Sequence, residues 1–194
     1  MSAPTLLASV LAMSNLASNI LRVFALALNL PENWFMNKID CHGSALRALN
    51  YPEMETPPKP GELWASAHTD YGSITILKQD DAPGGLQVMD RDGNWVTVGY
   101  TGDSFVINLG DLMQRWTNER WVSTLHRVVN PPVDPGCPTR RQSMAFFHNI
   151  NPDHLVEVIE TCTSAELPAK FEPITAGEHL MQKHNAAMGH DTSA

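Results

Sequence analysis

Two imidazoles and one carboxylate are the side chains of this sequence best suited to chemistry. His68 and Asp70 stand two positions apart in the segment Ala67-His-Thr-Asp-Tyr-Gly-Ser73, and His126 comes in a later segment. Side chains two residues apart on a strand point to the same face, so His68 and Asp70 could chelate one ion. Two histidines and a carboxylate leave open positions on a metal and suit non-haem Fe(II). The sequence therefore predicts a metal site at His68, Asp70 and His126.

A second polar pair, Arg141 and Ser143, follows His126 and also has strand spacing. A guanidinium is permanently charged and forked, and a hydroxyl adds one more donor, so the pair suits a carboxylate. Arg140 and Arg127 are the alternatives. Arg140 has the opposite parity on the strand, and Arg127 should face away from the direction of His126. The spacing therefore favours Arg141 and Ser143 as the carboxylate site.

Other residues of reactive or metal-binding types are better explained by structural roles than by a role in a site. An isolated His-x-Asp pair is common by chance, and His148 has the opposite parity to Arg141, which favours a structural role. The three cysteines, Cys41, Cys137 and Cys162, are odd in number and widely spaced. This spacing argues against a disulfide framework and a Cys-based zinc site, and it suits the reducing cytoplasm. No Gly-x-Ser-x-Gly nucleophile elbow occurs.

Length and charge narrow the classes of protein. The chain has 194 residues, enough for one domain with its own core. A net charge of −8 provides no basic surface for nucleic acid. These values favour a globular protein with no nucleic-acid partner.

An apolar stretch at residues 5–30 predicts the first helix. Leu6, Val10, Met13, Ala17, Ile20 and Phe24 recur at helical spacing, and polar residues interrupt the other side. No Lys or Arg precedes the stretch, so the charged start of a signal peptide is missing. We expect an amphipathic helix packed on the domain, with no membrane role.

The rest of the chain reads as short strands separated by turns, with helices at both ends. Strands are predicted at 44–51, 64–70, 73–79, 86–89, 95–98, 104–109, 124–130 and 141–149, and shorter helices at 32–39, 111–118 and 179–188. About eight short strands indicate a mainly β jelly roll or barrel with flanking helices. We predict a helical segment at 1–40, a β core at 41–155 and a C-terminal segment with a helix at 156–194.

Seven blocks of the sequence, in order, resemble the isopenicillin N synthase-like family of Fe(II)/2-oxoglutarate-dependent dioxygenases. They are His68-Thr-Asp70, Gly85-Leu-Gln-Val, Gly93-Asn-Trp-Val, Val106-Ile-Asn-Leu-Gly-Asp111, Trp116-Thr-Asn, Ser123-Thr-Leu-His126-Arg-Val and Arg141-Gln-Ser143. The resemblance implies a double-stranded β-helix that uses Fe(II), 2-oxoglutarate and O2. It implies hydroxylation of a small molecule, with release of succinate and CO2. The implied iron ligands are His68, Asp70 and His126.

The same resemblance assigns the cosubstrate residues. Arg141 and Ser143 would bind the distal carboxylate of 2-oxoglutarate, and Tyr51 matches a tyrosine near the cosubstrate or substrate. Two alternatives stay open. A 2-oxoglutarate-independent oxidase of the isopenicillin N synthase type would use the same residues for a substrate carboxylate. A non-catalytic roll would bind a metal or a small acid.

One departure from the family pattern affects the expected assembly. Family members usually carry roughly a hundred more residues before the first long helix, so the sequence resembles a natural short form, a truncated gene or a fragment. Such a form is expected to expose apolar surface that a homodimer could cover.

Overall fold

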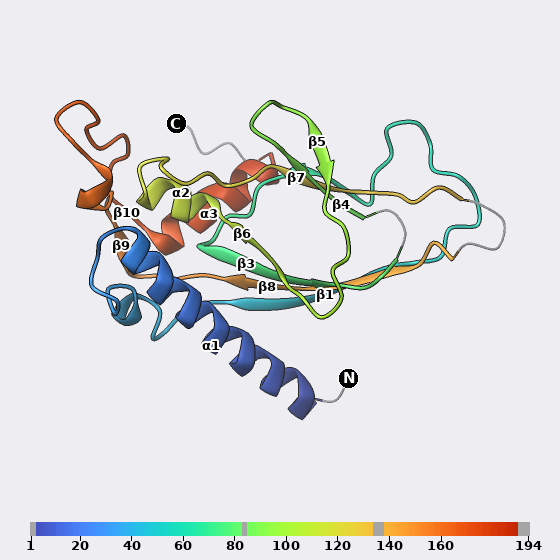
Figure 1. The fold of residues 1–194 in the computed structure, drawn as a ribbon, viewed down its shortest axis with the longest axis horizontal. Coiled ribbons are helices and arrows are strands. Elements are labelled where there is room, and N and C mark those ends of the chain that lie inside the picture. Colours follow the sequence, from blue (N-terminus) through green and yellow to red (C-terminus); the bar gives the residue numbers. More distant parts are fainter. Residues whose placement is uncertain (1–2, 83–84, 134–137, 190–194) are drawn as a thin grey trace.

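Two four-stranded antiparallel sheets make up the body of the protein in the computed structural model, which describes residues 3–82, 85–133 and 138–189. The first sheet has the order β1-β8-β3-β6, with β1 at Ala45–Tyr51, β8 at Arg141–His148, β3 at Ile74–Gln79 and β6 at Val106–Leu109. The second has the order β2-β7-β4-β5, with β2 at Ala65–His68, β7 at His126–Val129, β4 at Gly85–Met89 and β5 at Trp95–Thr97. The predicted jelly roll, a double-stranded β-helix, is thus confirmed (Figure 1).

Alternate residues along the strands of the first sheet point to its two opposite faces. Ile74, Ile76 and Phe146 are buried on the outer face, where they pack with Ala17 of helix α1 (Ala3–Ala27). Thr75, Leu77 and Ala145 belong to the opposite parity and line an internal cavity. One face of the sheet therefore supports α1 and the other faces the cavity, as Figure 1 shows for the position of α1.

Helix α1 packs on the sheet as predicted, and the predicted stripe is confirmed except at Leu6, because Ala17 is buried and Val10, Met13, Ile20 and Phe24 pack partly buried against the same core. The fully buried positions are Ala17, Leu21, Ala25 and Leu28, and only Ala17 belongs to the predicted set. Leu6, at the start of the predicted stripe, is 39% exposed. The reason is that all the fully buried positions lie in the second half of the helix or just after it, where the core of the domain covers it.

A second core cluster closes one end of the roll. It joins α1 to α2 (Asp111–Trp116), with Trp116, Phe35, Met113 and Ile150 almost entirely buried. The rings of Phe35 and Trp116 meet nearly edge to face, with centroids 5.2 Å apart. Helix α3 (Ala176–Ala187) packs at the same end, and a capping box between Thr175 and Glu178 begins it.

Several predicted elements are shorter than expected or were missed. The helix predicted at 32–39 is a single 3-10 turn, η1 (Met36–Lys38). The strand predicted at 64–70 ends at His68. The short antiparallel pair of β9 (Leu155–Val156) and β10 (Ile174–Thr175), and the 3-10 turn η2 (Glu160–Cys162) between them in the chain, were not predicted. Two-residue strands carry almost no periodicity, which explains why the pattern missed them.

Some predictions about partners and organisation are not decided by the fold. Among the described residues, one helix, Pro4–Ala27, is long and apolar enough to cross a membrane by length and composition. Cys41 and Cys162 carry free thiols, and Cys137 lies outside the described residues. The three-part division of the chain, the homodimer, the absence of membrane and nucleic-acid partners and the cytoplasmic location stay predictions.

Candidate functional site

His68, Asp70 and His126 converge at one point between the two sheets. His68 and His126 are register partners across β2 and β7, and their ring centroids lie 4.3 Å apart. His126 Nε2 is 3.7 Å from Asp70 Oδ1. One potential ligand atom from each of the three residues lies within 4.8 Å of the other two. The structure thus brings together the three residues that spacing selected.

Asp70 reaches this point by a different route from the predicted one. The chain leaves the sheet after His68, so Asp70 lies just beyond the strand. Its backbone oxygen accepts a hydrogen bond of 2.7 Å from the amide of Asp111. The turn also needs a close approach of Gly110 to Gly72, because a Cβ on Gly110 would overlap the Gly72 carbonyl oxygen. Contacts with the start of α2, and not strand alternation, therefore place Asp70.

The free atoms of the three side chains suit a divalent metal. His68 Nδ1 lies 2.7 Å from the Ser66 carbonyl oxygen, and His126 Nδ1 lies 2.9 Å from that of Thr124. A carbonyl can only accept, so each Nδ1 carries the proton and each Nε2 offers a lone pair. Asn108 Nδ2 donates to Asp70 Oδ2 at 2.7 Å, leaving Oδ1 for an ion. Two neutral imidazoles and one carboxylate fit Fe(II).

The metal-ligand cluster opens into a cavity of about 210 Å³ between the sheets. Its walls include Leu77, Leu86 and Val88, and apolar side chains there limit the access of water. Arg141, Ser143 and Tyr51, the predicted cosubstrate residues, also line it. The cavity therefore places a potential metal site and a potential carboxylate site within one enclosure.

Arg141 is a buried cation with unused hydrogen-bonding capacity. Its side chain sits on β8 with the residue 2% exposed, and Nη2 donates to Gln79 Oε1 at 3.2 Å. Its Cζ lies 5.3 Å from the centroid of the Tyr51 ring, which stacks on Trp64 at 4.8 Å. Nη1 is buried and has no hydrogen-bond partner. A buried, unpaired guanidinium N–H is costly, and a bound carboxylate would satisfy it.

The two alternative arginines are committed elsewhere. Arg140 is exposed and donates from Nε to Asn50 Oδ1 at 3.0 Å. Arg127 donates to Gln87 at 2.9 Å, and its Cζ lies 4.1 Å from the Trp95 ring centroid. Neither side chain lines the cavity. Arg141 is therefore the arginine that the fold directs inward.

Comparison with known proteins agrees with this geometry. The family model of the 2OG-Fe(II) oxygenase superfamily matches residues 43–150. The chain belongs to this superfamily. The match does not distinguish the narrower isopenicillin N synthase-like family, which stays a prediction.

Individual members of the superfamily are similar over most of this chain. A 2-oxoglutarate-Fe(II) type oxidoreductase, hxnY of Emericella nidulans, is 35% identical over 183 residues, which are 92% of this chain and 50% of that protein. Homoarginine-6-hydroxylase 2-ODD-233 of Oryza sativa subsp. japonica is 36% identical and covers 87% of this chain and 51% of its own length. The crystal structure of a full-length Neurospora crassa protein in complex with alpha-KG superposes with a TM-score of 0.84, at 36% identity, covering 90% of this chain and 54% of that one. The chain thus spans about half the length of the relatives it matches.

In this superfamily member, His148 lies outside the cavity. It contacts the segment that follows β2 and carries Asp70, residues 69–73, which we call the metal loop. Ser73 Oγ lies 2.9 Å from His148 Nδ1, and the Ser73 amide donates to the His148 carbonyl oxygen at 3.0 Å. Burial, and then the nearby His42, lower the pKa of His148 to about 3. His148 is thus a buried neutral histidine that fixes the turn after Asp70, in agreement with the predicted structural role.

Sequence reasoning missed the residues that support the metal loop. Thr69 Oγ1 donates to Asp111 Oδ2 at 3.0 Å, and Lys183 Nζ of α3 forms an ion pair of 2.7 Å with the same oxygen. Asn108 and Asp111 both lie in the block Val106-Ile-Asn-Leu-Gly-Asp111, which the resemblance singled out without assigning roles. That block was the sequence feature that could have identified Asn108 and Asp111. No sequence feature indicated Lys183, because its partner Asp111 is distant in the chain.

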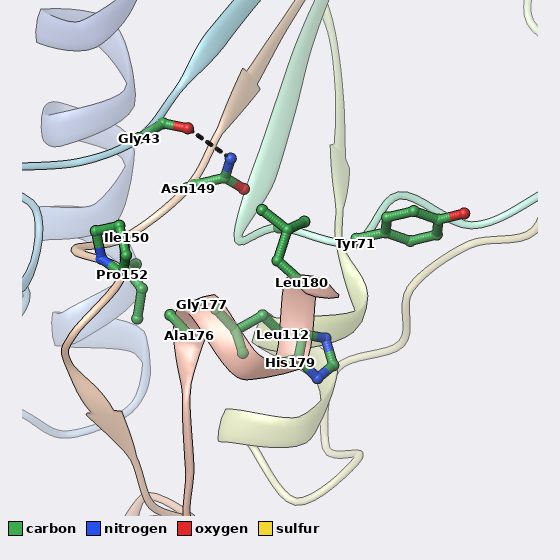
Figure 2. A pocket seen from close by; sticks show the side chains of 11 residues that line it. Gly43, Tyr71, Leu112, Asn149, Ile150, Pro152, Ala176, Gly177, His179 and Leu180 are labelled. Carbon is green, nitrogen blue, oxygen red and sulfur yellow. Dashed lines mark hydrogen bonds between the residues drawn. The ribbon is translucent and has the colours of Figure 1, made fainter. Parts of the chain in front are cut away.

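A small apolar cavity of about 30 Å³ lies where α3 meets this loop (Figure 2). Leu180 of α3 and Leu112 of α2 line it together with Tyr71, and Asn149 Nδ2 donates to the Gly43 carbonyl oxygen at 2.8 Å beside it. Its size and apolar lining fit a packing gap between helices. Of these two cavities, the one of about 210 Å³ beside His68, Asp70 and His126 is the better suited to a ligand.

Proposed function

We propose that this chain is an Fe(II)- and 2-oxoglutarate-dependent dioxygenase that hydroxylates a small molecule, with release of succinate and CO2. The observation that supports this most strongly is one shared cavity. Metal-ligating atoms of His68, Asp70 and His126 and the unpaired guanidinium N–H of Arg141 both belong to it. A metal-binding protein alone would have no need of a buried, unsatisfied cation beside the metal site.

Each residue has a defined task in this proposal. His68, Asp70 and His126 would hold Fe(II), and Arg141 with Ser143 would hold the distal carboxylate of 2-oxoglutarate. Tyr51 supports Arg141 through its ring. Fe(II) with bound 2-oxoglutarate supplies the activation of dioxygen needed to oxidise a C–H bond.

The protein contributes position and exclusion of water. Asn108 and the carbonyls of Ser66 and Thr124 fix the ligand atoms before a metal arrives, which lowers the entropic cost of binding. Apolar walls at Leu77 and Val88 reduce the contact of bound reactants with water and so strengthen electrostatic interactions there. These residues hold reactants in place, and none of them needs to transfer a proton.

Two alternatives use the same geometry differently. In a 2-oxoglutarate-independent oxidase, Arg141, Ser143 and Tyr51 would hold a substrate carboxylate. In a non-catalytic roll, the metal and a small acid would bind without turnover. We favour the dioxygenase because the superfamily and the similar proteins point to 2-oxoglutarate as the acid that meets Arg141.

Formation of succinate tests the proposal. Purified chain with Fe(II), ascorbate, O2 and 2-oxoglutarate should release succinate even without substrate, at a slow uncoupled rate. Arg141→Ala should abolish this release at limiting 2-oxoglutarate. Arg140→Ala is the matched control, since it removes a neighbouring charge that points away from the cavity. Iron binding without succinate formation, in the presence of a wide range of small molecules, would support the oxidase or the binding protein instead.

A further inference from the structure

The residues just before Arg141 are held by a carboxylate from a distant part of the chain. Glu53 follows β1 and accepts hydrogen bonds from two successive backbone amides, at 2.6 Å from Thr139 to Oε1 and at 3.0 Å from Arg140 to Oε2. Oε1 also accepts a bond of 2.9 Å from the hydroxyl of Thr139. Thr139 is 1% exposed, and its hydroxyl in turn accepts a bond of 2.6 Å from the Met54 amide. We call the contacts of Glu53 with Thr139 and Arg140 the Glu53 clasp.

The Glu53 clasp lies where the sheet stops holding β8. Tyr51 and Arg141 are the last paired residues of β1 and β8, and the pairing of β8 with β3 ends at Ser143 opposite Gln79. The residues before Arg141 therefore have no ladder partner, and the ends of strands are where the backbone opens most easily. Two successive N–H groups that point to one place favour an anion. Glu53 thus holds the chain just beyond the last pair of the ladder.

The charge of Glu53 suits this task. The hydrogen bond from the Thr139 amide, then that from the Thr139 hydroxyl, lower the pKa of Glu53, so its carboxylate is ionised at neutral pH. Hydrogen bonds to an ionised acceptor are stronger than those to a neutral one. Glu55 is an exposed carboxylate in the same loop, but it makes no hydrogen bond or ion pair in the part of the chain that the structure describes. The loop therefore contains one engaged carboxylate and a natural control for it.

The guanidinium of Arg141 depends on the position of its own backbone. Its only side-chain hydrogen bond in the described residues is the one of 3.2 Å to Gln79, and the Tyr51 ring is 5.3 Å away. The guanidinium lies at the end of a long stem, so a small rotation at the first residue of β8 is amplified at Nη1. That nitrogen is the buried donor without a partner. Movement of the strand end would therefore misdirect the group that the proposed cosubstrate needs.

We propose that Glu53 is a positioning residue for cosubstrate binding. Its clasp fixes the first residue of β8 and so directs the guanidinium of Arg141 toward the distal carboxylate of 2-oxoglutarate. Glu53 is not among the residues that line the cavity, so it acts through Arg141 and not by contact with a ligand. This inference rests on the proposed function, because it assumes that 2-oxoglutarate is the acid that Arg141 binds.

The binding of two keto acids to Glu53→Ala tests this role. 2-Oxobutyrate keeps the keto acid group of 2-oxoglutarate but lacks the distal carboxylate, so it makes no use of Arg141. Isothermal titration calorimetry under anaerobic conditions on Fe(II)-loaded protein measures both affinities. The dissociation constant of 2-oxoglutarate should rise about tenfold, within the range for coupled neighbouring residues, while those of 2-oxobutyrate and Fe(II) stay unchanged. Glu53→Gln keeps the size of the side chain and should lose part of this affinity, because a neutral amide has one accepting oxygen for two N–H groups.

Further variants separate positioning from general stability. Glu55→Ala removes the unengaged carboxylate and should bind 2-oxoglutarate like wild type. In an Arg141→Ala background, Glu53→Ala should cause no further loss of 2-oxoglutarate affinity, since its effect passes through that arginine. Amide hydrogen exchange of metal-free protein reports on the clasp itself, because the amides of Thr139 and Arg140 should exchange faster in Glu53→Ala.

The remaining outcomes separate this inference from the proposed function. If wild-type protein binds no 2-oxoglutarate, the proposed function fails and this inference fails with it. If wild type binds 2-oxoglutarate through Arg141 but Glu53→Ala binds it equally well, the positioning role is wrong and the proposed function stands. The same conclusion follows if Glu53→Ala loses affinity for both keto acids, or for Fe(II), in parallel.

Discussion

The two ends of the cavity are held in place by different means. At the metal end, each histidine is fixed by the carbonyl two residues before it, Ser66 for His68 and Thr124 for His126. At the carboxylate end, the contacts of Arg141 come from other strands, with Gln79 on β3 and the Tyr51 ring on β1. Local hydrogen bonds orient the two histidines, whereas the register of the sheet orients the arginine.

This difference predicts which structural changes each end of the cavity tolerates. A local tether survives small shifts between strands, because the side chain and its partner move together. Arg141 has no such tether, so displacement of a neighbouring strand changes its direction. Substitution of a residue that contacts Fe(II) or 2-oxoglutarate directly should weaken the binding of that ligand alone. Substitutions that alter the packing around these residues should affect 2-oxoglutarate binding more than Fe(II) binding.

The largest effect is expected from loss of a metal ligand. Asp70→Ala should weaken Fe(II) binding by more than about 100-fold, since loss of outer partners alone costs about 10–100-fold. Anaerobic metal titration measures this effect. Asp92→Ala, an exposed carboxylate in the β4–β5 turn, is the control and should bind iron normally. Equal iron binding in Asp70→Ala would remove this residue from the site.

Arg141→Ala should affect the other end alone. Truncation of one partner of a buried, charged hydrogen-bonded pair costs about 2–5 kcal/mol, so the dissociation constant of 2-oxoglutarate should rise at least about 30-fold. Iron affinity should not change, because Arg141 does not contact the ligands. Isothermal titration calorimetry with Fe(II) and with 2-oxoglutarate measures the two affinities separately. A parallel loss of iron would mean that the two ends are coupled.

Asn108→Ala sharpens the comparison at the metal end. Its amide fixes Asp70 Oδ2 at 2.7 Å, and loss of this outer partner should weaken Fe(II) binding by about tenfold, the lower part of the range for such contacts. Binding of 2-oxoglutarate to the iron-loaded protein should change less. Unchanged iron affinity would show that the carboxylate is oriented without Asn108.

Gly85→Ala is the corresponding change around Arg141. Gly85 has a φ of +109°, and an added Cβ would lie 3.0 Å from Arg141 Nε. The backbone conformation alone should cost about 1–3 kcal/mol of stability. We expect a lower Tm and weaker 2-oxoglutarate binding, with iron affinity retained at low temperature. Normal 2-oxoglutarate binding would show that Arg141 adapts to the shift.

The smallest effect at neutral pH concerns His148, behind the metal loop. The unfolded chain takes up a proton near pH 6.5, whereas burial and His42 lower the pKa of His148 in the folded protein to about 3. Between these values the unfolded state binds more protons, so the free energy of unfolding falls as the pH falls. Urea unfolding of metal-free protein from pH 7 to pH 4 measures the slope. His148→Gln should be less stable at pH 7 but have a shallower slope, and an unchanged slope would assign the acid sensitivity to other groups.

The convergence of His68 and Asp70 could be predicted from the sequence because its signal is local. His68 and Asp70 are close in the chain, and the prediction that they meet is confirmed, although the reason given was incomplete. Spacing on a strand could not show that Asp70 leaves the sheet to pair with the start of α2. Ser66 and Thr124 act through backbone oxygens, which no residue type reveals.

The parts of the fold that the sequence did not predict depend on distant contacts. Strands β9 and β10 are too short to show a period, and the ion pair of Lys183 with Asp111 joins α3 to the start of α2, which is far away in the chain. Which residues of α1 are fully buried depends on where the core covers the helix, and not on its own pattern. Parity along β8 did place Arg141 and Ser143 on the cavity, because alternation holds throughout that strand.

The central claim is that one cavity holds a metal site and a separate carboxylate site. The visible spectrum under anaerobic conditions tests it most directly, with Fe(II) and 2-oxoglutarate added singly and together to wild type, His126→Ala and Arg141→Ala. A weak charge-transfer band should appear only in wild type and only with both additions. In Arg141→Ala, it should return at high 2-oxoglutarate, and in His126→Ala it should stay absent. A band that Arg141→Ala leaves unchanged at low 2-oxoglutarate, or that survives in His126→Ala, would contradict the account.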